Sequence, residues 1–464
     1  MEVRQTTRSA PEVTRRRTLA AAAVAGLAAV AVTACGGSGG GDTNTLTVVY
    51  RQFGANEVQK NYLAGVKAEF EAANPGLTVD LQPIVAGEAE YPTKLQLLMR
   101  SARSAPDLIY EDTFQINSDI DAGYLRPLDD KIAGWADWAN FNETAKKGGT
   151  SLEGKVYGIP DGTDTRGIWF NKQIFAKAGL PADWAPKNWD DILAAARAVK
   201  AAVPDVQPLN VYAGKGVGEA SSMQGFEMLL YGTNDTLYDE STRKWIIGSK
   251  GFKDSLTFLD TIYEEGLAAS PQQVLDPTWA SKVSQQLIPQ GKLAIAVDGS
   301  FTALNWQPTG AVPWPEWSTV MSPTAMPTQT GQGAGRISLS GGWTWAIPQN
   351  SDNQDKAWEL ITLLSDKKHQ LQWAIENVQI PVRDDVASDP TYLAANPTNA
   401  FFAGLVKDTK YRPAYSVYPR VSSEIQVATE KVITGAAGVD QAAAEYDEAV
   451  RSITNGEVAG APGS

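Results

Sequence analysis

Carboxylates that stand close together in the sequence are the side chains with the clearest chemical potential. Glu111 and Asp112 are adjacent, and Asp161 and Asp164 are separated by two residues. Two carboxylic acids that flank a glycosidic bond can hydrolyse it, one as the acid and the other as base or nucleophile. The same groups also accept hydrogen bonds from the hydroxyls of a ligand that is bound and released unchanged. We favour ligand binding, and a surface glycosidase stays as the alternative.

Other candidate sites lack the context that their chemistry needs. Residues 149–155 (GTSLEGK) fit the first seven positions of a phosphate-binding P-loop, but Val156 follows where a magnesium-binding Ser or Thr is required. His369 is the only histidine, so a Ser–His–Asp triad would depend on it, and its polar neighbours indicate a solvated helix face. With Cys35 as the only cysteine, the chain has no internal disulfide and no Cys-based zinc site. We therefore expect no catalytic residues, no metal and no cofactor.

Alternating strands and helices are predicted to position the first acidic pair. Apolar periodicity predicts strand, helix, strand, helix and strand at residues 46–50, 57–73, 77–81, 91–102 and 107–110. This order is typical of a parallel sheet with right-handed crossovers. Ligands of such sheets bind beyond the carboxyl ends of the strands, which here are residues 51–53, including Gln52, and residues 111–114.

The rest of the chain continues the mixture of strands and helices. The predicted strands are residues 292–297, which run into 298–301, and residues 342–347. The predicted helices are residues 190–203, 355–365 and 440–453. Residues 307–335 are rich in Pro, Gly, Thr and Trp and predict a long irregular loop, and residues 456–464 predict a disordered tail.

The first 34 residues have the composition of an export signal. Arginines precede an apolar run at 19–31, which is too short to span a bilayer, and small residues follow. Residues 14–19 (TRRRTL) resemble a twin-arginine signal, and residues 32–35 (VTAC) resemble the lipobox of bacterial lipoproteins. We predict a signal peptide at 1–34, lipidation of Cys35, and a flexible tether at 35–44 that anchors the protein to the outer face of the cell membrane. The alternative is an incidental Cys35 near an ordinary cleavage site.

Charge and aromatic content narrow the class of partner. The formal net charge of −13 argues against nucleic acid and against an electrostatic attachment to anionic lipid. The chain holds 14 Trp residues, whose rings fill cores and also stack on ligands. Roughly 410 residues remain after the signal and tether, enough for two domains.

Four sets of short runs follow one another along the chain. They are PDLIY (106–110) with DAGYLRPL (121–128); VYGIP (156–160) with IWFNK (168–172) and FAKAGLP (175–181); SGGW (340–343) with DKAW (355–358); and QIPVR (379–383). In this order, the four sets resemble the family 1 extracellular solute-binding proteins of ABC importers, the maltodextrin-binding group.

The resemblance implies an α/β fold, a type II-like periplasmic-binding-protein fold with two lobes and a ligand cleft between them. Lobe 1 would be residues 45–160 plus 340–385, and lobe 2 would be residues 163–336 plus 392–455. The chain would cross between lobes near 161–162, 335–338 and 384–390. The implied function is capture of a sugar, an oligosaccharide in particular, and its delivery to the permease of an ABC importer, by a monomer without enzymatic activity.

The resemblance also implies ligand contacts, residue by residue. Spacing from the first motif places residues 111–114 in the family's first ligand loop, and spacing back from Asn171 places Asp164 at a sugar-binding carboxylate. Residues 299–301 match "gsW" with Phe301 in place of Trp. The full set of predicted ligand contacts is Gln52, Glu111, Asp112, Thr113, Phe114, Asp164, Arg166, Glu219, Gln224, Ser300, Phe301, Gly342, Trp343, Tyr415 and Tyr418.

Two alternatives to this interpretation stay open. Each aromatic residue could fill the core instead of contacting a ligand. The acidity of Asp112, Asp161, Asp164 and Glu219 also leaves room for a cation, so a polyamine, a metal chelate or a peptide could be the ligand of the same fold.

Overall fold

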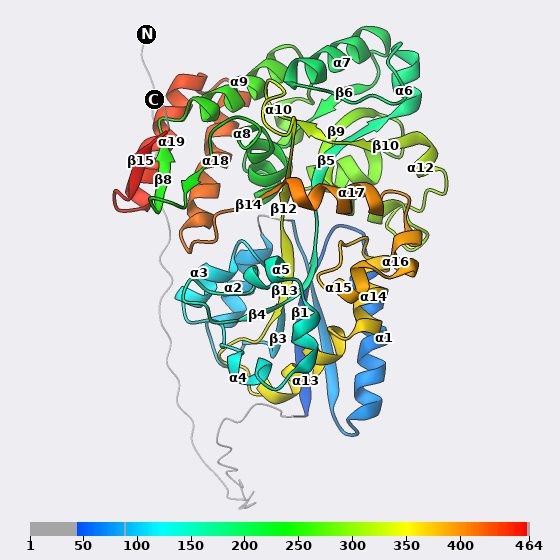
Figure 1. Ribbon diagram of the computed structural model, residues 1–464, viewed down its shortest axis with the longest axis vertical. Coiled ribbons are helices and arrows are strands. Elements are labelled where there is room, and N and C mark those ends of the chain that lie inside the picture. Colours follow the sequence, from blue (N-terminus) through cyan, green and yellow to red (C-terminus); the bar gives the residue numbers. More distant parts are fainter. Residues whose placement is uncertain (1–43, 88–89, 462–464) are drawn as a thin grey trace, which may run out of the picture. The chain divides into compact units, whose positions relative to one another are not determined.

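The first lobe is built on a five-stranded sheet with the order β2-β1-β3-β13-β4. The computed structural model describes residues 44–87 and 90–461, so the predicted signal, Cys35 and residues 35–43 of the tether lie outside the described residues (Figure 1). Strands β1 (Thr45–Gln52), β2 (Thr78–Val85) and β3 (Leu108–Asp112) run parallel, as predicted. Strand β13 (Gly342–Ala346) lies antiparallel between β3 and β4 (Gly158–Thr163).

Both faces of this sheet are buried, because apolar side chains occupy successive positions of β1, one of its inner strands. On β1, Val48 and Tyr50 belong to the core on one face, and Val49 belongs to the core on the other. Helices α1 (Val58–Ala73), α13 (Gln354–Leu364) and α14 (Lys367–Glu376) supply side chains to the first core. Helix α2 (Tyr91–Met99) covers the opposite face through Tyr91, Leu95 and Met99.

The second lobe is built on a four-stranded sheet with the order β10-β5-β9-β6. Strand β5 (Arg166–Asn171) is antiparallel to β9 (Leu293–Gly299) and to β10 (Met321–Thr324), while β6 (Gln207–Asn210) is parallel to β9. Helices α6 (Lys172–Lys177), α7 (Trp189–Ala202), α9 (Lys250–Glu264), α18 (Tyr418–Ile433) and α19 (Val439–Ile453) pack around it. Helix α7 begins where the Asn188 side chain accepts a hydrogen bond from the backbone N–H of Asp191.

Two segments of the second lobe are π-helical, and a 3-10 helix lies beside one of them. The π-helices are η2 (Ala220–Glu227) and η3 (Val283–Leu287), and the 3-10 helix is η4 (Ser300–Trp306). Helix η2 packs against β9 and α18, and η3 packs against η4. Because π-helical turns are frequent at functional sites, the surroundings of these segments are the first place to search for one.

The chain passes between the two sheets at two short connections. Strand β4 leads through Asp164 and Thr165 into β5, and β12 (Arg336–Ser340) leads through Gly341 into β13 (Figure 1). Strand β12 belongs to a third sheet, β11-β12-β14, with β11 (Met326–Pro327) and β14 (Thr409–Tyr411). The predicted lobe boundaries and crossing points stay predictions.

Three expectations from the sequence were wrong. The predicted loop at 307–335 contains α12 (Trp317–Val320), β10 and β11, because buried Met321 and Met326 hold these short segments against the sheets. In the predicted disordered tail, β15 (Val458–Gly460) pairs in parallel with β8 (Lys244–Ile247). His369 is buried instead of solvated, because it lies where α14 packs on α1.

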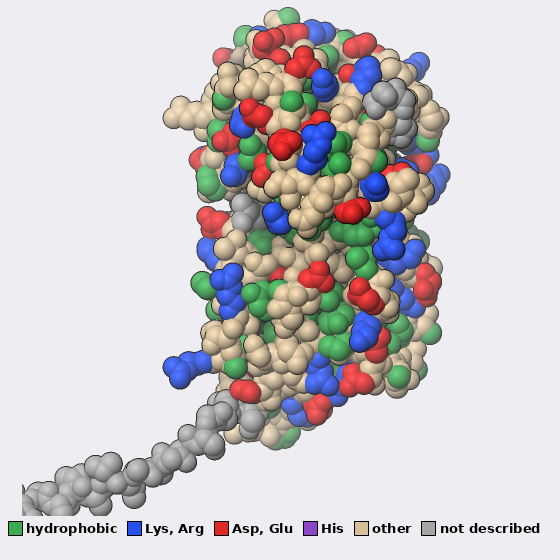
Figure 2. Space-filling model, turned by 90° about the vertical axis from the view of Figure 1, so that its left-hand side faces the viewer, with side chains coloured by type: hydrophobic (Ala, Val, Ile, Leu, Met, Phe, Trp, Pro, Cys, Tyr) green, Lys and Arg blue, Asp and Glu red, His purple; other side chains and the backbone are tan. Residues whose placement is uncertain are grey.

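The remaining elements connect these layers. They are α3 (Ile116–Asp121), α4 (Asp129–Ile132), η1 (Ala136–Asn140), α5 (Glu143–Lys147), β7 (Tyr238–Asp239), α8 (Met228–Leu230), α10 (Pro271–Val274), α11 (Trp279–Lys282), α15 (Asp384–Ala387), α16 (Pro390–Ala395), α17 (Asn399–Leu405) and η5 (Val406–Asp408). Within the described ranges, the helices all lack the length and apolar content that a membrane crossing requires. On the face in Figure 2, acidic and basic side chains are intermixed, without the basic stripe typical of nucleic-acid binding.

Two glycine substitutions test the packing of η2. Gly225→Ala should lower the free energy of unfolding by about 1–3 kcal/mol or more, because the added Cβ would lie 1.9 Å from the carbonyl oxygen of Tyr212. Gly65→Ala is the matched control, because Gly65 is exposed within α1 and has open space around it. This substitution should raise the free energy of unfolding by about 0.8–1 kcal/mol, because alanine has the higher helix propensity. Urea unfolding measures both, and a neutral Gly225→Ala would contradict the close packing.

Candidate functional site

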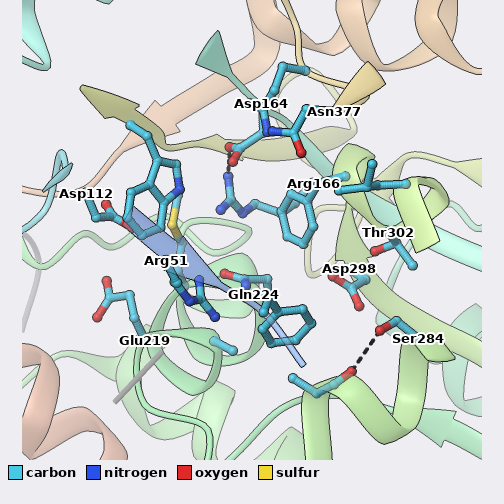
Figure 3. A pocket seen from close by; sticks show the side chains of 18 of the residues that line it. Arg51, Asp112, Asp164, Arg166, Glu219, Gln224, Ser284, Asp298, Thr302 and Asn377 are labelled. Carbon is cyan, nitrogen blue, oxygen red and sulfur yellow. Dashed lines mark hydrogen bonds and ion pairs between the residues drawn. The ribbon is translucent and has the colours of Figure 1, made fainter. Parts of the chain in front are cut away.

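A cavity between the two lobes gathers polar and aromatic side chains from many elements. The space that it encloses is about 1060 Å³, including the part that opens to solvent. Figure 3 shows that the labelled side chains, among them Asp112, Glu219 and Gln224, surround a common space. The lining residues are Arg51, Phe53, Asn56, Gln59, Asp112, Asp164, Arg166, Tyr212, Glu219, Ala220, Met223, Gln224, Ala280, Ser284, Asp298, Phe301, Thr302, Leu304, Asn305, Gly342, Trp343, Asn377, Gln379 and Arg412.

Trp343 forms part of the first-lobe wall on a firm aromatic support. Its ring stacks on Tyr110 with centroids 4.9 Å apart and an interplanar angle of 6°. The ring of Tyr91 packs edge-on against the indole, with centroids 5.8 Å apart. The Tyr91 hydroxyl donates to the carbonyl oxygen of Tyr110 at 2.7 Å. Since Tyr110 covers one face of the indole, the part of Trp343 that lines the cavity is held in a fixed orientation.

Phe301 and Arg166 line the second-lobe side of the cavity together. The guanidinium of Arg166 lies 5.6 Å from the centre of the Phe301 ring. Arg166 also forms a buried ion pair with Asp164, drawn as a dashed line in Figure 3. Asp164 accepts a further hydrogen bond from the N–H of Gly341 at 2.8 Å, which ties the two interlobe connections to each other.

Arg412 bridges the two lobes inside the cavity wall. It donates to Asp112 Oδ1 at the end of β3 (2.8 Å) and to Glu219 Oε1 at the start of η2 (3.1 Å). Its side chain is only 6% exposed. Burial alone would lower the pKa of Arg412, but Asp112 and Glu219 raise it, so the guanidinium stays charged. We call Asp112, Arg412 and Glu219 the interlobe bridge.

Asp298 is a further carboxyl group in the wall. It is the last residue but one of β9, and it accepts hydrogen bonds from the Tyr212 hydroxyl at 2.9 Å and from the N–H of Gly299 at 2.7 Å. Burial raises its pKa to about 6, and these donors limit the rise. It therefore stays ionised at neutral pH and can accept hydrogen bonds from a ligand.

The charges of the wall largely neutralise one another. Asp164 is paired with Arg166, and the interlobe bridge joins two carboxylates to one guanidinium. Amide side chains stand among them: Asn56, Gln59, Gln224, Asn305, Asn377 and Gln379. Such a wall can both donate and accept hydrogen bonds without presenting a strong field of one sign.

The structure brings together in the wall eight of the predicted contacts. They are Asp112, Asp164, Arg166, Glu219, Gln224, Phe301, Gly342 and Trp343. Their direct contact with a ligand stays a prediction.

The other predicted contacts lie outside the wall. Thr113 accepts a hydrogen bond from Arg412, and Phe114 lies under the same guanidinium at 5.1 Å. Tyr418 is buried behind Glu219, and Tyr415 packs on Tyr238. Gln52, Glu111 and Ser300 adjoin wall residues in the sequence, and Glu111 and Ser300 are buried.

Both acidic pairs that suggested hydrolysis contribute one carboxyl group to the cavity and one to the interior. Burial, followed by the neighbouring Asp119, raises the pKa of Glu111 well above its usual range. Burial also raises the pKa of Asp161 to about 7, and Gln370 donates to it at 3.0 Å. Neither pair therefore directs two carboxyl groups at one bound molecule.

Sequence reasoning missed several wall residues. Arg51 and Phe53 flank the predicted Gln52 at the carboxyl end of β1, where the strand-end rule could have found them. Asp298 follows the predicted strand at 292–297, and the strand-end rule could have found it. Arg412 had no such signal, because it lies 300 positions from Asp112.

Comparisons with known proteins agree with this architecture. A family model described as bacterial extracellular solute-binding protein matches residues 54–371. A putative binding protein of Brucella abortus (strain 2308) is 25% identical over 380 residues, which cover 81% of this chain and 85% of the relative. A lactose-binding protein of Rhizobium radiobacter is 21% identical over 303 residues, which cover 63% and 64%.

Solved structures share the fold across nearly all of the described chain. The GacH receptor of Streptomyces glaucescens GLA.O, solved unliganded and with acarbose, has a TM-score of 0.76 at 21% identity, covering 89% of this chain and 99% of the receptor. Maltose-bound MalE3 of T. maritima has a TM-score of 0.76 at 20% identity, covering 88% of this chain and 100% of that protein.

Arg412→Ala tests the interlobe bridge. The change should lower the free energy of unfolding by about 3–5 kcal/mol, because it leaves Asp112 and Glu219 buried without their shared cation. Arg197→Ala is the matched control, since Arg197 pairs with Glu265 at the surface, where a small effect is expected. Urea unfolding at neutral pH measures both, and equal effects of the two substitutions would contradict the bridge.

Proposed function

The chain belongs to the family of bacterial extracellular solute-binding proteins, and from this premise we propose that it captures a sugar in the cavity between its lobes. The bound sugar would then be delivered to the permease of an ABC importer. The observation that carries the proposal is the composition of the cavity wall, where aromatic rings alternate with paired charges and amides.

The chemistry of a sugar matches this wall. A sugar ring has apolar C–H faces, which aromatic plates such as Trp343 and Phe301 can cover. Its rim of hydroxyls both donates and accepts hydrogen bonds, so it needs carboxylates and amide oxygens as well as guanidinium and amide N–H groups. Hydrogen bonds from neutral hydroxyls to charged groups contribute about 1.5–3 kcal/mol each. The relatives solved with maltose and with acarbose, and the lactose-binding relative, support a sugar as ligand.

A cationic ligand fits the wall less well. Three of its carboxylates, Asp112, Asp164 and Glu219, already bind a guanidinium of the chain. A polyamine would have to compete with Arg166 and Arg412 for these partners. The family consists of binding proteins, and we propose that this chain also binds without turnover.

Location and assembly complete the proposal. The family is extracellular, and we propose that a lipid on Cys35 anchors this member to the outer face of the membrane. The bound and closed form would then reach the permease as a monomer.

A thermal-shift screen of the purified chain tests the proposed ligand class. Maltose, lactose, monosaccharides, spermidine and amino acids serve as probes. A sugar at 100 times its dissociation constant should add about 2.7 kcal/mol to the stability and raise the melting temperature. If spermidine or an amino acid raises the melting temperature and no sugar does, the ligand is not a sugar. Release of product from an oligosaccharide would instead establish an enzyme.

Trp343→Ala tests the stacking plate. The variant should bind the sugar found in the screen more weakly by about 1–3 kcal/mol, by analogy with base stacking on aromatic side chains. Trp358→Ala is the matched control. Trp358 belongs to α13, packs edge-on against Trp135 and takes no part in the wall. Calorimetric titration gives the affinities. If both variants lose stability and both keep the wild-type affinity, Trp343 belongs to the core and not to the site.

A further inference from the structure

The Tyr418 hydroxyl lies between two buried carboxyl groups behind the cavity wall. Its oxygen is 2.7 Å from Glu219 Oε1 and 2.7 Å from Glu227 Oε1. A tyrosine hydroxyl has one hydrogen, so it can donate to only one of these two oxygens. The other short contact is a hydrogen bond only if that carboxyl group carries a proton and donates it to the tyrosine oxygen.

Glu227 is better placed than Glu219 to hold this proton. Burial raises the pKa of Glu219 as well, but Arg412 and the Ser422 hydroxyl, which donate to it at 3.1 Å and 2.6 Å, favour its ionised form. Glu227 Oε2 has no hydrogen-bond partner among the described residues, which suits a neutral group. Burial, followed by the charge of Glu219, raises the pKa of Glu227 to about 8.

The proton changes the charge that faces the first lobe. With it, Arg412, Glu219 and Glu227 carry no net charge beside the Asp112 carboxylate. Without it, the same three groups carry one negative charge, which repels Asp112 across the lobe interface. Asp112 lies on β3 of the first lobe, whereas Glu219 and Glu227 belong to the second lobe. Repulsion between these carboxylates therefore opposes the approach of the two lobes.

We propose that Glu227 is a positioning residue that carries a proton and holds it more tightly when the lobes close, so that ligand binding is linked to proton uptake. It acts through Tyr418 and Glu219 on the interlobe bridge, without touching the ligand. The linkage to ligand binding rests on the proposed function, because it needs the ligand. The proton on Glu227 is independent of the proposed function.

The other titratable and charged groups near Glu227 do not supply this effect. Tyr231 and Tyr446 face it, and burial raises the pKa of both hydroxyls well above the usual value, so they stay neutral. Arg166 and Arg412 are the nearby cations, and both lower the pKa of Glu227. Glu219 and Tyr418 belong to the relay itself.

The stored proton is tested without ligand by comparing wild type with Glu227→Gln. A folded-state pKa above the unfolded value means that the native state holds a proton that the unfolded state releases, so stability is lost as the pH rises. Between about pH 5 and about pH 8, the unfolding constant of the wild type should rise up to about tenfold per pH unit relative to the variant. Glu264→Gln, at an exposed carboxylate of α9, is the control of equal charge change and should follow the wild type. Parallel curves for wild type and Glu227→Gln would overturn the stored proton.

The linkage to binding is tested with maltose and lactose as probes. Wild-type affinity should fall several-fold from about pH 7 to about pH 9, and that of Glu227→Gln should stay constant. If the variant does not fold, the wild type decides: its binding enthalpy should differ between phosphate and Tris buffers, which reports proton uptake. Equal enthalpies in the two buffers, or equal pH profiles of both proteins, would overturn the linkage. If neither sugar binds at any pH, the proposal that the ligand is a sugar is wrong. The unfolding data still show whether Glu227 carries the proton.

Discussion

The salt bridge of Arg412 to Asp112 and Glu219 is the interaction on which the site depends. A cavity that binds a polar ligand has to bury charged groups, and a buried charge without a partner is strongly destabilising. Here one guanidinium neutralises a carboxylate from each lobe across the contact between the lobes. The same contact therefore stabilises the wall and favours the closed arrangement. Opening of the lobes in a hinge motion would break the ion pair between Arg412 and Asp112.

The rest of the fold holds these partners in place. The five-stranded sheet fixes Asp112 at the end of β3, where β13 also presents Trp343. On the other side, η2 carries Glu219, Met223 and Gln224 to the wall, and close contact of Gly225 with the Tyr212 backbone sets its position. Helix α18 then supplies Tyr418 and Ser422 as donors to Glu219. Asp112 and Glu219 are thus held by β3 and by η2, both of which are buried.

Local patterns in the sequence predicted the sheets and part of the site. Strand ends identified Asp112, and the resemblance to a family identified Asp164, Arg166 and Trp343, because these residues follow motifs of fixed spacing. The relay behind the wall was beyond such reasoning. Glu227 and Tyr418 are 191 positions apart, and only the packing of η2 on α18 brings them together.

The errors have the same physical cause. Residues 458–460 are poor in strand-forming side chains, yet β8 offers an open edge that pairs with them. His369 has polar neighbours in the sequence, but the packing of α14 on α1 buries it. In both cases tertiary contacts decided what local composition could not.

The most direct test of the account is a crystal structure of the chain grown with maltose or with the sugar that binds best in the screen. We expect electron density for the sugar between the lobes, with a ring face on Trp343 and hydroxyls within hydrogen-bond distance of the interlobe bridge. Sugar density elsewhere on the molecule, with the cavity filled only by water, would contradict it.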